Sequence, residues 1–146
     1  MKDKLLSKQG WVILLICIIS FFINNRVVVP DIMEARNMVT AREMVHDGNW
    51  LVPTMNGDLR LEKPPLPTWL TAVAEMISPD NLALQRAMAG FAAILLVAFF
   101  YLTAVQVMRN KRYAFISTIL LCTCYNIILM GRTASWDIYC HAFMMG

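Results

Sequence analysis

The sequence predicts an all-α membrane protein, a transmembrane helix bundle with juxtamembrane helices on its extracytoplasmic side. Hydrophobic residues make up 58% of the 146 residues, charged residues make up 16%, and the mean hydropathy is +0.54. Soluble domains carry about a quarter charged residues, so this composition excludes an ordinary soluble enzyme. Because each span takes roughly 20 apolar residues, three or four spans fill the chain and leave no separate soluble domain.

The first expected span covers residues 5–29. Three lysines stand at the start of this region: Lys2, Lys4 and Lys8. This layout suits either a signal peptide or a retained first helix. The residues around Ile23 are bulky or polar and offer no small-residue cleavage site, which favours the retained helix. Near its end, Arg26 either reaches the lipid headgroups or lines a polar pocket.

Two further spans are expected over residues 79–108 and 113–131, and a fourth begins within 137–146. The second starts at Ser78-Pro79, with serine as the helix cap and proline at the first helical position. Small residues on its first turns predict the close approach of a neighbouring helix. They are Ala89, Gly90 and Ala93. The chain ends inside the apolar fourth segment, so we interpret it as a piece of a longer protein.

Charged residues set the expected topology. The basic hinge at residues 109–112 and the N-terminal lysines flank two spans, so the positive-inside rule places both on the cytoplasmic side. Residues 31–86 and 131–137 then lie together outside. The four cysteines have neither zinc-ligand spacing nor a disulfide pattern, and are expected to be small buried hydrophobes. They are Cys17, Cys122, Cys124 and Cys140.

The extracytoplasmic segment, residues 31–78, holds most of the candidate chemistry. Helical spacing runs from Asp31 to a glycine stop at Asp47-Gly48. Asp31 and Glu34 lie three apart at the start of this helix. They suit a variant capping box, in which carboxylates bind backbone N–H groups, or a carboxylate pair that faces a ligand at the outer leaflet. The pattern leaves both interpretations open.

The second half of this segment carries basic residues. Asn56-Gly57 predicts a hairpin turn, which leads to Arg60 and Lys63 and then to a rigid, extended proline stretch at residues 64–67. Residues 68–77 predict an amphipathic helix along the membrane surface. The basic pair beside it favours an anion at headgroup depth, either one specific lipid phosphate or anionic lipid in general.

Asp137 stands where the chain turns apolar again. It suits either a helix N-cap or a carboxylate of a site on the outer face. With His141, four residues later, it would form one edge of a metal site, but two ligands are too few and no metal centre is predicted. The sequence has no glycine-rich phosphate loop, and nothing in it indicates a nucleic-acid partner.

Four segments carry a family resemblance by their order and spacing: DIMEARNMVTAREM, GNWLVP, RLEKPPLPTW and GRTASWD. They resemble the N-terminal part of the polyprenyl-phosphate-sugar-dependent glycosyltransferases of the GT-C superfamily, in the branch with the aminoarabinose transferases of lipid A and the protein O-mannosyltransferases. The resemblance covers most of the chain. It implies a larger helix bundle that transfers a sugar from a polyprenyl phosphate to a lipid or protein acceptor on the extracytoplasmic side.

The resemblance also implies catalytic carboxylates. The family's first acidic pair falls on Met33-Glu34, so Glu34 aligns with its second acid. Asp31, two residues before Met33, is the candidate substitute for the missing first acid. The family's second acidic position, ahead of the next helix, falls on Asp137. One of these carboxylates would orient or deprotonate the acceptor hydroxyl.

The implied phosphate site is basic. The family lysine that is implicated in holding the lipid phosphate maps to Lys63, and Arg60 and Arg36 are the arginines expected to help it stabilise the departing phosphate. No nucleotide is needed and no cofactor is certain, although a divalent cation is compatible with this chemistry. The expected partners are the polyprenyl-phosphate-linked sugar, the acceptor and membrane lipids. The expected location is the bacterial inner membrane, with the N-terminus cytoplasmic.

Two other classes of function stay open, a non-catalytic membrane module that binds anionic lipid or a partner helix, and the first helices of a transporter. Neither needs Asp31, Glu34 and Lys63 to converge with Asp137 on one pocket, so the proximity of these residues discriminates between the classes. The 146-residue chain alone is expected to be inactive, because the implied lipid cavity needs later helices.

Overall fold

The computed structural model describes residues 8–146, which form seven helices and one short hairpin. The helices are α1 (Lys8–Phe22), α2 (Ile32–Asp47), α3 (Pro65–Ile77), α4 (Leu82–Met108), α5 (Lys111–Cys122), α6 (Tyr125–Gly131) and α7 (Asp137–Met145). Strand β1 (Thr54–Met55) pairs antiparallel with β2 (Asp58–Leu59). The all-α class expected from the sequence is confirmed. The start of the expected first span, with Lys2 and Lys4, lies outside the described residues.

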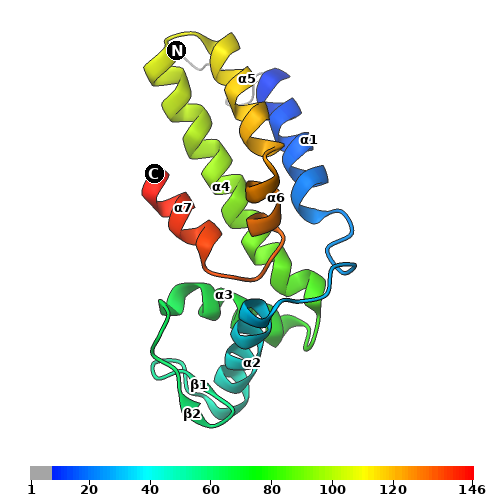
Figure 1. The fold of residues 1–146 in the computed structure, drawn as a ribbon, viewed down its shortest axis with the longest axis vertical. Coiled ribbons are helices and arrows are strands. Elements are labelled where there is room, and N and C mark those ends of the chain that lie inside the picture. The colour runs from blue at the N-terminus through cyan, green and yellow to red at the C-terminus, as the bar shows by residue number, and fades with distance from the viewer. Residues whose placement is uncertain (1–7) are drawn as a thin grey trace.

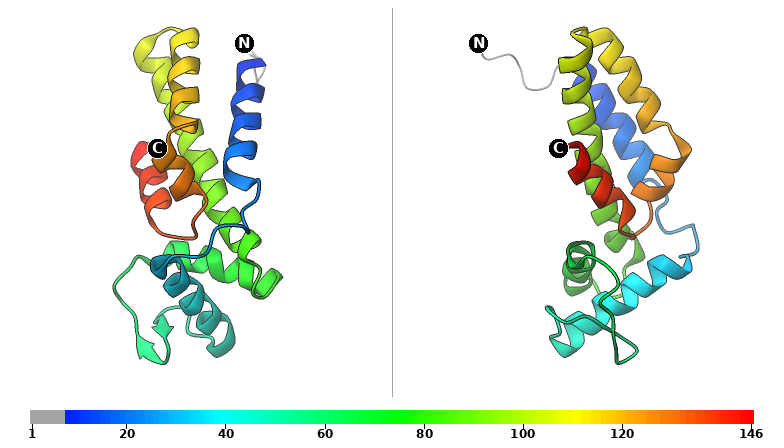
Figure 2. Two further views of the ribbon diagram at one scale, coloured as in Figure 1. Left: turned by 45° about the vertical axis from the view of Figure 1, so that its right-hand side comes forward. Right: turned by 60° about the vertical axis from the view of Figure 1, so that its left-hand side comes forward.

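The described chain is elongated and has two parts (Figure 1). Helices α1, α4, α5, α6 and α7 form a bundle along the long axis. Helices α2 and α3 and the hairpin gather at one end of it, and two further views show the same division (Figure 2). We call this end, residues 31–81, the outer unit. Helix α4 packs against α1, α3, α5, α6 and α7, so it is the element that joins the two parts.

Small residues let other helices approach α4 closely. Ala89 and Ala93 are fully buried. A Cβ atom added at Gly90 would lie only 2.9 Å from the Phe22 ring of α1, well inside van der Waals contact. The predicted close approach at these positions is therefore confirmed.

The cysteines differ in their surroundings. Cys17 of α1 and Cys122 of α5 are buried side by side, with their Sγ atoms 3.7 Å apart, as small apolar residues would be. Cys124 and Cys140 are exposed in this structure, so the prediction of burial is wrong for these two.

The expected span over residues 113–131 is broken. Helices α5 and α6 meet at an angle of 64° across Thr123 and Cys124. The Thr123 hydroxyl donates to the Ile119 carbonyl at 3.0 Å, and such bonds to the preceding turn loosen helices. Within residues 8–146, α4 alone is long and apolar enough to cross a membrane by itself, or α4 and the bent pair if that pair counts as one span. The described part of α1 is apolar but shorter.

Two helix starts differ from the prediction. Asn81, and not Ser78, caps α4, and its Oδ1 accepts from the Leu84 N–H at 3.3 Å. Ser78-Pro79 form a turn before it. Helix α3 begins at Pro65, so the stretch predicted to be extended is mostly helical. Prolines fit there because the first helical residues have N–H groups without helical partners.

The predicted helix and hairpin of the outer unit are confirmed. Asp31 caps α2, and Gly48 ends it with a left-handed φ of 74°. Asn56 and Gly57 form the turn between the strands, both with positive φ. Glu43 of α2 accepts hydrogen bonds from the Asn56 N–H and the Thr54 hydroxyl, so the hairpin is fixed to α2.

Candidate functional site

A buried ion pair joins the outer unit to α4. The Arg86 guanidinium donates through Nε and Nη2 to both carboxylate oxygens of Glu34, at 2.7 Å each. Its Nη1 donates to the Asn25 carbonyl at 2.5 Å. The two side chains are only 1% and 0% exposed, so both charges depend on each other for stabilisation.

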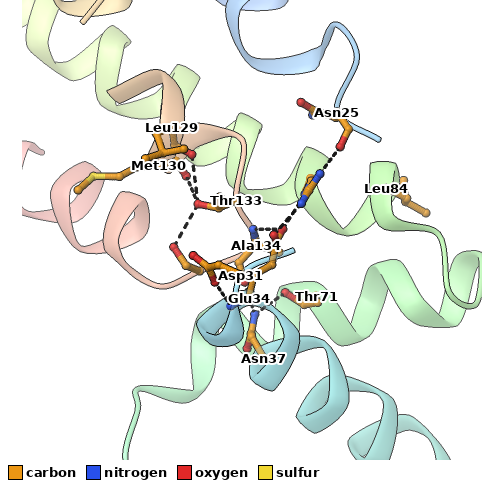
Figure 3. A network of polar contacts seen from close by, with 12 residues as sticks. Asn25, Asp31, Glu34, Asn37, Thr71, Leu84, Leu129, Met130, Thr133 and Ala134 are labelled. Carbon is orange, nitrogen blue, oxygen red and sulfur yellow. Dashed lines mark hydrogen bonds and ion pairs between the residues drawn. The ribbon is translucent and has the colours of Figure 1, made fainter. Parts of the chain in front are cut away.

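The same face of α2 holds the segment between α6 and α7 by the backbone N–H and carbonyl of a single residue, Ala134 (Figure 3). The Ala134 N–H donates to Glu34 Oε1 at 2.9 Å, and the Ala134 carbonyl accepts from Asn37 Nδ2 at 2.8 Å. Asn37 also contacts α3, where it accepts from the Thr68 hydroxyl at 2.7 Å and donates to Thr71 at 3.0 Å. Glu34 and Asn37, one helical turn apart, therefore fix the segment that carries Trp136 and Asp137.

The two candidate acids at the start of α2, Asp31 and Glu34, have different surroundings and different hydrogen-bond partners. Asp31 is exposed, and its Oδ1 accepts from the Glu34 N–H at 2.7 Å, so the capping interpretation is confirmed for Asp31. Glu34 does not cap the helix. Its two oxygens are occupied by Arg86 and Ala134, and its side chain is fully buried. Among the predicted carboxylates of α2, Asp31 is the one that meets solvent.

Two cations gather over one aromatic ring. Arg60 Cζ lies 5.2 Å and Lys63 Nζ lies 5.1 Å from the centroid of Trp136, within the range of cation–π attraction. Arg60 Nη1 donates to the Arg36 carbonyl at 2.5 Å and to the Thr40 hydroxyl at 2.7 Å, which anchors the guanidinium to α2. In the part of the chain that the structure describes, neither cation forms a salt bridge with a carboxylate.

The surroundings of Arg60 are short of negative charge. Burial lowers the pKa of its guanidinium from the ordinary 12.5, the nearby Glu62 opposes this change, and the positive charge of Arg36 adds to it. Arginine stays protonated at any physiological pH. Because burial is the main cause of the lowered pKa, the Arg60 guanidinium is partly removed from water.

Asp137 directly follows Trp136, the residue whose ring lies under the two cations. It is the first residue of α7 and is exposed, while the cap position falls on Trp136, whose side chain makes no capping bond. The N-cap interpretation of Asp137 is therefore wrong. Within residues 8–146, no group of three or more His, Cys, Asp or Glu side chains is placed to hold a metal ion, so Asp137 and His141 gain no further ligand.

The predicted residues thus converge in part. The start of α2, residues 60–63 and residues 134–137 meet around Ala134 and Trp136. Arg60 and Lys63 lie over the ring of Trp136, the residue that precedes Asp137 in the chain. Asp31 is linked to the contact between Glu34 and Ala134, because its Oδ1 accepts a hydrogen bond from the Glu34 N–H (Figure 3).

Three residues of this site were missing from the prediction. Arg86 had a visible signal, because it is the single charge within residues 82–108. Asn37 lies three residues after Glu34, on the same helical face. Trp136 had no such signal, because its importance depends on cations that come from another segment.

The comparisons with known proteins agree with this geometry. A family model described as dolichyl-phosphate-mannose-protein mannosyltransferase matches residues 11–146. The chain belongs to this mannosyltransferase family. Its membership confirms the resemblance to GT-C glycosyltransferases that four sequence segments indicated.

Relatives in this group transfer aminoarabinose. The chain is 34% identical over 92 residues to an undecaprenyl phosphate-alpha-4-amino-4-deoxy-L-arabinose arabinosyl transferase of Pseudomonas savastanoi pv. phaseolicola, over 63% of this chain and 17% of that protein. It is 31% identical over 108 residues to a Shewanella sediminis protein of the same description, over 74% of this chain and 19% of that one.

A solved relative shows the same fold. The crystal structure of ArnT from Cupriavidus metallidurans, bound to undecaprenyl phosphate, matches with a TM-score of 0.77 at 21% identity. The match covers 95% of this chain and 26% of that one. The chain therefore has the fold of one part of a GT-C membrane protein, and it spans only 17% to 26% of the length of these three relatives.

Proposed function

We propose that this chain is part of a glycosyltransferase that moves a sugar from a polyprenyl-phosphate donor to a lipid or protein acceptor. One observation carries the proposal, the pair of cations Arg60 and Lys63 over Trp136, without a salt bridge to a carboxylate among the described residues. A sugar phosphate needs such a pair, because negative charge grows on the phosphate as the sugar leaves. The two relatives described as undecaprenyl phosphate aminoarabinose transferases also support the proposal.

In the proposed reaction, the bond between the anomeric carbon and the phosphate oxygen breaks, and the phosphate leaves with the electron pair. The acceptor hydroxyl forms the new bond to that carbon and loses its proton to a carboxylate. Lys63, Arg60 and Arg36 stabilise the departing phosphate. Asp137 and Asp31 are the proposed carboxylates, because both are exposed.

For Glu34 we propose a positioning role instead. The Glu34 carboxylate already accepts three hydrogen bonds and is fully buried, so it does not meet a substrate from solvent. Its bond to the Ala134 N–H fixes the segment that leads to Asp137. Loss of Glu34 would therefore reduce transfer by displacing Asp137, even though Glu34 does not touch the substrate.

The proposed setting is the bacterial inner membrane, with several spans and a cytoplasmic N-terminus. Residues 31–86 then face the extracytoplasmic side, where polyprenyl-phosphate sugars meet their acceptors. The positive hinge at residues 109–112 supports this orientation. A divalent cation, if the reaction needs one, would take ligands beyond those grouped in residues 8–146.

The test measures sugar transfer from a radiolabelled polyprenyl-phosphate donor by the native protein, including any sequence that follows residue 146. We expect Lys63→Ala to lower transfer at least about tenfold, because a charge-assisted hydrogen bond is worth roughly 1.5–3 kcal/mol. Lys63→Arg should recover only part of the rate. Asp58→Asn, in the exposed hairpin, is the matched control and should keep it.

A module that only binds anionic lipid would use the same cations without Asp137. Asp137→Asn therefore separates the two functions. Loss of transfer with unchanged lipid binding supports the transferase, whereas wild-type rates in both Lys63→Ala and Asp137→Asn would refute it.

A further inference from the structure

Trp136 has a role beyond filling space. It is 5% exposed, and its indole N–H has no acceptor among the described residues. Buried donors in native proteins nearly always have a partner, because an unpaired one costs about 1–3 kcal/mol. Its ring is meanwhile the common neighbour of Arg60 and Lys63, which repel each other and have no carboxylate partner there.

A small hollow adjoins the ring and is lined in part by Arg60, Lys63, Thr40, Thr68 and Trp136. Its volume of about 10 Å³ admits one water-sized group. Both threonine hydroxyls are already used as donors, Thr40 to the Arg36 carbonyl at 2.9 Å and Thr68 to Asn37 Oδ1 at 2.7 Å. Neither threonine proton is therefore free for a ligand, and the charged donors that line the hollow are the two cations.

We propose that Trp136 is a positioning residue for the phosphate of the polyprenyl donor, an inference that rests on the proposed function. Its ring holds the Lys63 and Arg60 side chains in place by cation–π attraction. Its Nε1–H donates to one phosphate oxygen that enters the hollow. A neutral donor between two cations fixes the orientation of the phosphate, and so the direction in which the sugar faces Asp137.

Two substitutions separate the two parts of this role. Trp136→Phe keeps an aromatic ring and removes the N–H, while Trp136→Leu removes both. Binding of farnesyl phosphate to the purified protein in micelles should weaken about fivefold in Trp136→Phe and more than about tenfold in Trp136→Leu. Farnesol, which has no phosphate, and phosphatidylglycerol vesicles, which offer a diester headgroup, should bind all variants alike. Trp11→Phe, on the exposed face of α1, is the matched control.

A spectroscopic signal tests the hydrogen bond directly. In ¹⁵N-labelled protein, the indole signal of Trp136 is identified by its loss in Trp136→Phe. Farnesyl phosphate should move this signal downfield, and farnesol should leave it in place. A role in packing alone would not move it.

The outcomes distinguish this inference from the function on which it rests. If Lys63→Ala loses farnesyl phosphate binding while both Trp136 variants keep it, the role of Trp136 is wrong and the phosphate site stands. If Lys63→Ala also binds normally, the phosphate site itself is wrong. Weaker binding of farnesol by Trp136→Leu would indicate a folding defect in that variant. The test then depends on Trp136→Phe and on the indole signal of the native protein. Unchanged affinity of Trp136→Phe for farnesyl phosphate, together with an indole signal that does not move, would overturn the inference.

Discussion

Glu34 and Arg86 form a two-point ion pair in the protein interior, although 52 positions separate them in the sequence. One comes from α2 of the outer unit and the other from the first turns of α4. Because the pair is bonded further to Asn25 and Ala134, four segments of the chain meet at this one contact (Figure 3). The pair is therefore the main polar link between the outer unit and the bundle.

Breaking this pair on one side should destabilise the protein severely. We expect Glu34→Gln and Arg86→Met each to lower the free energy of unfolding by about 3–5 kcal/mol, because each leaves a buried group without its partner. Thermal unfolding in micelles measures this. Asp47→Asn is the control, since Asp47 pairs with His46 at the surface and should contribute little to the free energy of unfolding.

The double variant Glu34→Leu with Arg86→Met should regain part of that stability, since no buried charge remains. It should still transfer sugar poorly, because the Ala134 N–H has lost its acceptor. A double variant as active as the native protein would contradict the positioning role of Glu34.

Asn37→Ala should loosen the segment before α7 while the bundle stays folded. The substitution removes the donor to the Ala134 carbonyl and the acceptor of the Thr68 hydroxyl, for an expected loss of about 1–3 kcal/mol. Hydrogen exchange should speed up at residues 132–137 and stay slow in the middle of α4. Thr103→Ala, at an exposed position of α4, serves as the control. Unchanged exchange at residues 132–137 would show that Asn37 does not hold this segment.

Gly90 should tolerate no larger residue. A methyl group there would sit 2.9 Å from the Phe22 ring, so Gly90→Val should push α1 away from α4 at a cost of about 1–3 kcal/mol. The measurement is the thermal midpoint in micelles. Ala98→Val, on the exposed side of the same helix, should leave the midpoint nearly unchanged.

The proposed orientation predicts opposite accessibility for two loops. A cysteine introduced at Asn56 should react with an impermeant thiol reagent added outside intact cells, and one at Asn110 only after the membrane is opened. The background is a variant without native cysteines. Labelling of both positions from the same side would overturn the arrangement.

The fold class, the helix of the outer unit and the hairpin could be predicted because their signals are local. Asp31 and Gly48 act within one or two helical turns, and so does the Asn56-Gly57 turn. The break between α5 and α6 escaped prediction, because residues 113–131 carry no charge and hydropathy says nothing about where a helix bends. The start of α4 was misjudged because two good caps, Ser78 and Asn81, stand only three residues apart.

Some residues of the candidate site could be predicted from the sequence, but the hydrogen bonds and ion pairs that hold them could not. Charge and resemblance pointed to Lys63 and Arg60, and these do lie over one ring, that of Trp136. Whether a carboxylate is free or engaged depends on partners far along the chain. Glu34 changed from a candidate catalytic acid to a buried anchor because of Arg86, which no local pattern connects to it.

The tie between α2, α4 and Ala134 also fixes the order in which the protein can be assembled during synthesis. When α2 emerges from the ribosome, Arg86 has not yet been made, and the Glu34 carboxylate must stay hydrated until the following helix has entered the membrane. The hydrogen bond from the Ala134 N–H to Glu34 can form only after about 50 further residues have been made, because Ala134 follows Arg86 by that distance in the chain. A chain that stops between these two points would have the Glu34–Arg86 pair without the hydrogen bond from the Ala134 N–H.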